Sequence, residues 1–149
     1  MKVIIQRVIE SRVRVKDEII GEIGKGMVLL LGIKNGDGEA QGQFLAEKCA
    51  HLRIFPDGEG KMNLSVLETN GEVLVVSQFT LYGDTQKGRR PSFIDAARPE
   101  VAEPLYLKFM EQLRSQGIKK VVEGRFGAMM VVEIFNDGPV TLELEAAGG

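Results

Sequence analysis

The sequence predicts an α+β fold, in which a mostly antiparallel, barrel-like β-sheet packs with two main helices in a single domain of residues 1–149. Three observations lead to this prediction. Strand-like segments fill both ends of the chain, and two segments with the helical spacing of apolar residues interrupt them. No repeat, low-complexity tract or linker divides the 149 residues, a length that fits one domain. Runs of strands around two helices favour an antiparallel sheet over an alternating βαβ fold.

The N-terminal third is predicted to consist of strands. Residues 3–8 form the first candidate strand, and Val13 and Val15 alternate with charged residues, which is typical of a half-buried strand. Residues 19–23 are expected to continue this ribbon. The run MVLLLGI, residues 27–33, is apolar apart from one glycine, so it predicts a central strand that is buried on both faces.

A first helix is predicted after the turn NGDG, with Asp37 as its cap. Gly42 is its one unfavourable residue, because glycine in a helix costs about 1 kcal/mol relative to alanine. The apolar residues that recur at helical spacing, and that we expect to face the core, are Ala40, Phe44, Leu45, Cys49 and Leu52.

A second helix is expected to begin near Glu103, which places Pro104 in its first turn, where proline is tolerated. Gly117 is a plausible residue to end it. The apolar stripe of this helix comprises Ala102, Leu105, Tyr106, Phe109 and Leu113. The remaining strands are predicted at residues 52–55, 73–79, 120–122, 129–135 and 140–144.

Composition excludes several classes of protein. The net charge of −2 gives no global basic field for nucleic-acid binding, and we expect no DNA partner. A single cysteine, Cys49, excludes an intramolecular disulfide and suits a reducing compartment. The longest apolar run, residues 27–31, is far shorter than the ~20 residues that span a bilayer, and charges interrupt the N-terminus before a signal peptide could form. We therefore expect a cytoplasmic protein with no membrane partner.

Metal or cofactor chemistry finds little support. With one histidine, His51, and one cysteine, the chain cannot assemble a nitrogen-and-sulfur zinc site within one subunit. Composition does not exclude a carboxylate magnesium site, but no acidic cluster stands out. No phosphate-binding glycine motif follows a strand. We expect no metal and no cofactor, a structural or solvent-facing role for His51, and a core position for Cys49.

The motif SQFTLYGD begins like a buried strand but places the polar residues Ser77, Gln78 and Thr80 where a strand is still expected to be apolar. A hydroxyl is a weak nucleophile without an adjacent base, and the motif contains no His, Lys or Cys. Its composition fits electrostatic stabilisation better, since backbone N–H groups at a strand end, helped by Gln78 and the hydroxyls, can hold a developing oxyanion. Alternatively, Ser77 and Thr80 satisfy backbone groups at a strand end.

A second motif, NDGPVT, places a Gly138-Pro139 step between two strand-like runs. The simpler interpretation is an ordinary hairpin turn between residues 129–136 and 140–144, with a trans peptide bond. The functional interpretation is that glycine lets the backbone approach a ligand closely while proline fixes its direction.

A small basic cluster follows the first motif, with Lys87, Arg89 and Arg90 in an irregular stretch. Such charges usually lie in a solvated loop. The functional alternative is a phosphate clamp, in which arginine makes bidentate contacts.

Together the motifs make the chain recognisable. It resembles the D-aminoacyl-tRNA deacylases over nearly its full length, since SQFTLYGD matches the Ser-Gln-x-Thr signature of that family and NDGPVT matches its Asn-x-Gly-Pro-Val-Thr signature. The start MKVIIQRV, the middle KGRRPSF and the stretch GRFGAMM have the look and order of the family.

The resemblance implies a homodimer with active sites at the subunit interface, where a cis Gly138-Pro139 reaches into the pocket of the partner. It implies hydrolysis of the ester bond of D-aminoacyl-tRNA, or of glycine on a mismatched tRNA, at the tRNA 3′ end. One wall of the site is then Ser77, Gln78, Phe79 and Thr80, and the other is Gly138, Pro139, Val140 and Thr141. Phe126 and Met130 are implied to receive the terminal adenine.

The expected chemistry needs no side-chain base, because a positioned water, backbone donors and the tRNA 2′-OH can supply it. Two alternatives stay open. One is a hydrolase with Thr80 as covalent nucleophile, and the other is a non-catalytic module that binds the tRNA 3′ end.

Overall fold

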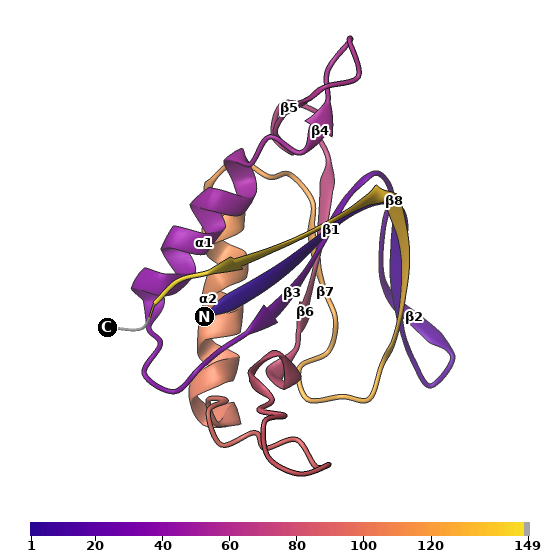
Figure 1. Cartoon of the computed structure of the whole chain (residues 1–149). Coiled ribbons are helices and arrows are strands. Elements are labelled where there is room, and N and C mark those ends of the chain that lie inside the picture. Colours follow the sequence, from indigo (N-terminus) through magenta and orange to yellow (C-terminus); the bar gives the residue numbers. More distant parts are fainter. Residues whose placement is uncertain (148–149) are drawn as a thin grey trace.

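Six strands form one sheet in the order β2-β1-β3-β6-β7, with β8 paired to the other side of β1 (Figure 1). This computed structural model describes residues 1–147, so Gly148 and Gly149 of the predicted domain lie outside the described residues. The strands of the sheet are β1 (Lys2–Val15), β2 (Glu18–Ile23), β3 (Gly26–Gly32), β6 (Glu72–Ser77), β7 (Val121–Glu123) and β8 (Val131–Glu145). The helices are α1 (Glu39–His51) and α2 (Pro99–Ser115), a 3₁₀ turn η1 covers Phe79–Tyr82, and β4 (Phe55–Pro56) pairs with β5 (Met62–Leu64) in a small ribbon.

The sheet is mixed, which refines the prediction of a mostly antiparallel one. β1 pairs antiparallel with β2, β3 and β8, but β3–β6 and β6–β7 are parallel pairs. The parallel pairs arise because α1 lies on the chain between β3 and β6, and α2 between β6 and β7, and such crossovers return the chain to the same end of the sheet.

The sheet curls until its two end strands meet. A Cβ on Gly21 of β2 would lie 2.7 Å from Val122 Cγ1 of β7, so the absent side chain permits this approach. Inside the curl lies a small apolar cluster built around Val13, Leu74 and Val76. The larger core lies on the other face, which α1 and α2 cover side by side (Figure 1). The barrel-like core with two helices is therefore confirmed.

The first helix departs from the prediction at its start and on one face. Its N-cap is Gly38, not Asp37. The Asp37 carboxylate instead accepts the Lys34 N–H at 2.7 Å and lies 2.7 Å from the N-terminal ammonium group. Ala40 and Phe44 are exposed, whereas the buried face carries Gly42, Leu45, Ala46, Cys49 and Ala50. Gly42 is used for close packing, since a Cβ there would lie 2.8 Å from Gln112 Oε1 of α2.

The second helix begins earlier than predicted, at Pro99 instead of near Glu103. Pro99 occupies its first turn, where no N–H is needed, so Pro104 lies in the helix interior. Its ring removes a bond to the Glu100 carbonyl, which water can satisfy because both residues are exposed. Gly117 follows the helix with φ +108°, in agreement with its predicted role at the C-terminus.

Several strand boundaries also differ. The first strand runs unbroken from Lys2 to Val15, whereas the strand expected at residues 52–55 shrinks to Phe55–Pro56 and the one expected at 73–79 ends at Ser77. The interpretation of Gly138-Pro139 as an ordinary hairpin turn with a trans bond is wrong, because β8 is one strand paired along the length of β1 and the bond is cis. Among the described residues, no helix has the length and apolar character needed to cross a membrane.

Candidate active site

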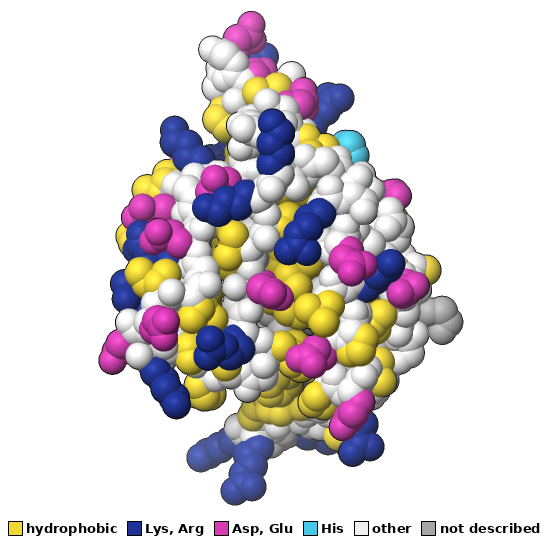
Figure 2. All heavy atoms as spheres, turned by 180° about the vertical axis from the view of Figure 1, so that it is seen from behind, with side chains coloured by type: hydrophobic (Ala, Val, Ile, Leu, Met, Phe, Trp, Pro, Cys, Tyr) yellow, Lys and Arg dark blue, Asp and Glu magenta, His cyan; other side chains and the backbone are white. Residues whose placement is uncertain are grey.

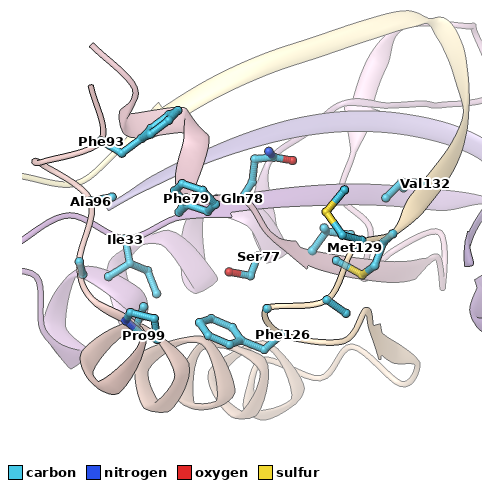
Figure 3. A pocket seen from close by; sticks show the side chains of 16 residues that line it. Ile33, Ser77, Gln78, Phe79, Phe93, Ala96, Pro99, Phe126, Met129 and Val132 are labelled. Atoms are coloured by element: carbon cyan, nitrogen blue, oxygen red, sulfur yellow. The ribbon is translucent and has the colours of Figure 1, made fainter. Parts of the chain in front are cut away.

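A cavity of about 560 Å³ opens where β6 ends, between the start of α2 and the segment that leads into β8 (Figure 3). Its walls are mostly apolar, and the polar side chains on it are Ser77 and Gln78. The lining residues are Ile33, Val76, Ser77, Gln78, Phe79, Phe93, Ala96, Ala97, Pro99, Ala102, Phe126, Gly127, Ala128, Met129, Met130 and Val132. A cavity of this size and character is typical of a small-molecule site.

Ser77 occupies the centre of the cavity, and its hydroxyl points into the open space (Figure 3). It is the last residue of β6, held in register opposite Leu31 of β3. The next residue, Gln78, donates its N–H to the Leu31 carbonyl at 2.8 Å, and its own carbonyl accepts the Leu81 N–H at 3.1 Å. The strand therefore turns sharply into η1 directly after Ser77.

The N–H groups of Phe79 and Thr80 stand at the start of η1. Within residues 1–147 neither N–H has a hydrogen-bond acceptor, as is usual for the first N–H groups of a helical turn. Phe79 lines the cavity next to Ser77, and Thr80 follows it just outside the lining. These donors are available to an oxygen that carries developing negative charge.

Thr80 is separated from the other residues of its motif. Ser77, Gln78 and Phe79 line the cavity, whereas Thr80 is exposed and is not on the lining. Its hydroxyl accepts a hydrogen bond from the side-chain amide of Gln78. The structure thus places Thr80 in a supporting position beside Gln78.

Phe126 and Met130 both line the cavity. The ring of Phe126 packs against Tyr106 of α2, with ring centroids 5.7 Å apart. Met130 Sδ accepts the Arg125 N–H at 3.3 Å. The Tyr106 hydroxyl donates to the Val75 carbonyl at 3.0 Å, and burial raises the pKa of this phenol well above its ordinary value. The two lining residues are therefore held by contacts outside the cavity.

The second predicted wall, Gly138, Pro139, Val140 and Thr141, does not line the cavity of its own chain. Gly138 and Pro139 are exposed, their peptide bond is cis, and Gly138 has φ +119°, which favours glycine. The elbow of residues 137–140 bulges out of the β1–β8 ladder, since β1 offers Arg7 alone between the pairs Val8↔Asn136 and Gln6↔Thr141.

Side chains on both strands hold this elbow in place. Asn136 accepts the Val140 N–H at 3.3 Å through Oδ1 and donates to Thr141 Oγ1 at 2.8 Å through Nδ2. Gln6 Nε2 donates to the same hydroxyl at 3.3 Å. Residues 136–141 therefore form a braced protrusion on the surface.

Arg7 of β1 contacts the elbow, and the sequence pattern does not reveal this role. Its Nη1 donates to the Ile54 carbonyl at 2.7 Å, and its Nε lies 3.2 Å from Asp137 Oδ2, within ion-pair distance but without the alignment of a hydrogen bond. A Cβ on Gly138 would lie 3.1 Å from Arg7 Nη2. The pairing of β1 with β8, which creates this contact, is not readable from the chain alone.

The basic residues Lys87, Arg89 and Arg90 lie in the loop between η1 and α2 and are exposed. This loop projects at the lower end of the molecule in Figure 1, and Figure 2 shows Lys and Arg side chains gathered at that end. None of the three forms an ion pair within the part of the chain that the structure describes, residues 1–147. Their charges are free to meet a polyanion.

No lining residue of the cavity titrates near neutral pH. His51 ends α1 away from the cavity and contacts Gln116 Oε1 at 3.2 Å. Cys49 is buried in the helix-covered core, and burial raises the pKa of its thiol to about 12. Within residues 1–147, no three His, Cys, Asp or Glu side chains are grouped to hold a metal ion. The cavity thus offers hydroxyl, amide and backbone donors but no side-chain base.

Solved structures share this architecture. A protein described as a "probable eukaryotic D-amino acid tRNA deacylase" superposes with a TM-score of 0.84 at 19% identity, covering 97% of this chain and 98% of that one. This chain therefore has the same fold as that protein. A second structure, of a "c-Myc DNA Unwinding Element Binding Protein", has a TM-score of 0.93 and 43% identity over 99% of both chains.

Sequence comparison defines the family. The D-Tyr-tRNA(Tyr) deacylase family matches residues 4–145, and the chain belongs to this family. A D-aminoacyl-tRNA deacylase of Brevibacillus brevis is 56% identical over 146 residues, which cover 98% of this chain and 100% of that protein. Another, from Heliobacterium modesticaldum, is 56% identical over 149 residues, covering 100% of this chain and 99% of the relative.

Proposed function

We propose that the protein hydrolyses the ester bond between a D-amino acid and the 3′ adenosine of tRNA, and also removes glycine from a mismatched tRNA. Water adds to the acyl carbon, the ester C–O bond breaks, and the ribose oxygen leaves with a proton. The full-length similarity to D-aminoacyl-tRNA deacylases at 56% identity carries this proposal. Such an enzyme belongs in the cytoplasm, where aminoacyl-tRNA is made and used.

In the proposed mechanism, backbone groups take the place of a catalytic side chain. The free N–H groups of Phe79 and Thr80 stabilise the oxyanion that forms when water attacks the ester. Ser77 and Gln78 orient the acyl group and the water, and the tRNA 2′-OH assists proton transfer. Holding the reacting groups in place can supply ~7–11 kcal/mol of the barrier reduction.

The apolar end of the cavity is the proposed site for the terminal adenine. Phe126 and Met130 line it, and both are fixed by contacts to Tyr106 and to the Arg125 N–H. A flat aromatic base fits against such side chains by stacking and sulfur–aromatic contact.

We further propose that two copies associate so that the elbow of one subunit completes the cavity of the other. The support is that Gly138, Pro139, Val140 and Thr141 belong to an exposed, braced protrusion that is absent from the cavity of its own chain. A backbone wall close to the substrate Cα would leave no space for an L side chain, so chirality is selected by exclusion.

Complementation between two inactive variants tests this arrangement. Ser77→Leu fills the cavity of its own chain, whereas Gly138→Val places a β-branched residue at φ +119°, a conformation it cannot adopt. A mixed dimer then contains one intact site out of two. Because random pairing after co-refolding of equal amounts makes about half of the dimers mixed, the mixture should have about a quarter of the wild-type activity. A mixture as inactive as its components would show that each site belongs to one chain.

The competing functions make different predictions. A non-catalytic module would bind the tRNA 3′ end without releasing the amino acid, and a Thr80 nucleophile would leave a trapped acyl-enzyme. The similarity to a protein named for binding a DNA unwinding element makes DNA a further candidate ligand. Release of D-[¹⁴C]tyrosine from tRNA by the purified protein, with no competition from a DNA duplex, would support the deacylase. Binding without release would support the first competitor.

A further inference from the structure

Two phenylalanine rings form an exposed pair at the mouth of the cavity (Figure 3). Phe79 belongs to η1 and is 56% exposed, and Phe93 precedes α2 and is 37% exposed. Their ring centroids lie 5.2 Å apart, with an edge-to-face angle of 72°. Adjacent aromatic rings that face solvent beside a cavity indicate a binding surface.

The backbone holds Phe93 in this position. A Cβ on Gly83 would lie 2.9 Å from Phe93 Cε1, so the ring rests directly on a glycine. Asp84 and Ser92 exchange both backbone hydrogen bonds, at 2.7 and 2.8 Å, immediately before Phe93. The backbone therefore fixes the position of Phe93 beside Phe79.

The same bridge closes the basic loop. Residues 85–91 form the loop between Asp84 and Ser92. This loop carries three exposed cations that form no ion pair within residues 1–147, namely Lys87, Arg89 and Arg90. Exposed aromatic rings next to free cations are the combination that binds single-stranded nucleic acid, because bases stack on the rings while phosphates meet the cations.

We infer that the Phe79–Phe93 pair stacks the base of the unpaired nucleotide that precedes the terminal adenosine, and that the loop of residues 85–91 holds the adjoining phosphates. This inference rests on the proposed function, which places the terminal adenosine in the cavity. The proposed dimer places the elbow of the second copy at the cavity itself. For the ring pair and the basic loop at its mouth, a second copy is a less suitable occupant than RNA, because the chain carries a net charge of only −2 against three neighbouring cations, whereas RNA carries one negative charge per nucleotide.

The test compares two D-tyrosyl hairpin RNAs that differ only in the nucleotide before the terminal adenosine, which is either intact or abasic. Stacking on an aromatic side chain corresponds to roughly 5- to 150-fold in kcat/KM, and removing the base should cost the wild type this factor. Phe93→Tyr keeps the ring and should keep the factor. Phe93→Leu keeps the apolar contact with Gly83 but removes the ring, so the abasic substrate should react within about twofold of the intact one.

Ile94→Ala is the matched control, because Ile94 is the next residue and 80% exposed but has no ring. It should keep the wild-type response to base removal. The inference would be overturned if the wild type reacted equally with both hairpins, or if Phe93→Leu still responded to removal of the base. It would also be overturned if Phe93→Leu changed the sedimentation of the protein, because the ring pair would then be a contact between copies.

Equilibrium binding of the uncharged hairpins separates this inference from the proposed function. Base-dependent binding without hydrolysis of either D-tyrosyl hairpin would refute the deacylase and retain the stacking site. Hydrolysis of both hairpins at equal rates, with equal binding, would retain the deacylase and refute the stacking site.

Discussion

The Thr80 hydroxyl bonds to the Gln78 amide at the edge of the cavity, and no side-chain base lines that cavity. We therefore expect Thr80→Ala to keep deacylation within about tenfold of wild type, because one neutral hydrogen bond contributes about 0.5–1.5 kcal/mol. Single-turnover rates on D-tyrosyl-tRNA measure this. A loss of about 10⁴-fold, the scale seen when a member of a catalytic triad is replaced, would make Thr80 the nucleophile.

Arg7 connects the elbow to the body of the protein through the Ile54 carbonyl and Asp137. Lysine has a single ammonium group and cannot contact the Ile54 carbonyl and the Asp137 carboxylate together as the guanidinium group does. Arg7→Lys should therefore release residues 137–140 and lower kcat/KM on D-aminoacyl-tRNA by roughly 100-fold, the cost of an ångström-scale displacement at a reacting site. Arg14→Lys is the control, because within residues 1–147 Arg14 pairs only with Glu133, at the surface. If both substitutions changed kcat/KM by the same small factor, Arg7 would have no role in positioning the elbow.

At the residue scale, the sequence locates lining residues of the cavity where the signal is local. Ser77 interrupts an apolar run, and in the structure it stands at the centre of the cavity. Phe126 and Met130 are predicted from the family resemblance alone, and both line the same cavity. Arg7 escapes prediction because its role depends on the β1–β8 register and its bulge.

At the scale of elements, Gly26 sets how closely β3 and β6 can approach. A Cβ at this position would lie 1.7 Å from the Glu72 carbonyl oxygen, a backbone atom that cannot move without separating the strands. Gly26→Ala should lower the free energy of unfolding by about 3 kcal/mol or more. Urea denaturation gives this value, and Gly58→Ala serves as control because its Cβ would meet nothing within 4 Å. Similar midpoints for the two variants would contradict the packing described.

Element prediction fails where tertiary pairing decides the outcome. The helical periodicity of residues 39–51 is readable, but Phe44 satisfies the same spacing and is exposed, because α1 packs on α2 through Gly42. The strand expected at residues 129–135 and the one at 140–144 are a single strand, since β1 is long enough to pair with both. The parallel pairing of β6 is likewise a consequence of crossovers that the local pattern does not encode.

At the scale of the whole molecule, the net charge of −2 hides a local concentration of positive charge at the lower end (Figure 2). Arg89→Ala and Arg90→Ala should each flatten the slope of log affinity for tRNA against log salt by roughly 0.7–0.9, the effect of one lost phosphate contact. Lys61→Ala, in the loop that joins β4 to β5, is the control and should leave the slope unchanged. Unchanged slopes in all three variants would show that Arg89 and Arg90 lie in a solvated loop and make no phosphate contact.

In the proposed dimer, the exposed backbone elbow of one subunit would leave no space for an L side chain in the cavity of the other, so we expect the protein to select the chirality of its substrate by exclusion. The most direct measurement is deacylation of D- and L-tyrosyl-tRNA, prepared on the same tRNA, by the wild-type protein under single-turnover conditions. We expect release of D-tyrosine and no release of L-tyrosine above the rate of spontaneous hydrolysis. Release of both at similar rates, or of neither, would contradict it.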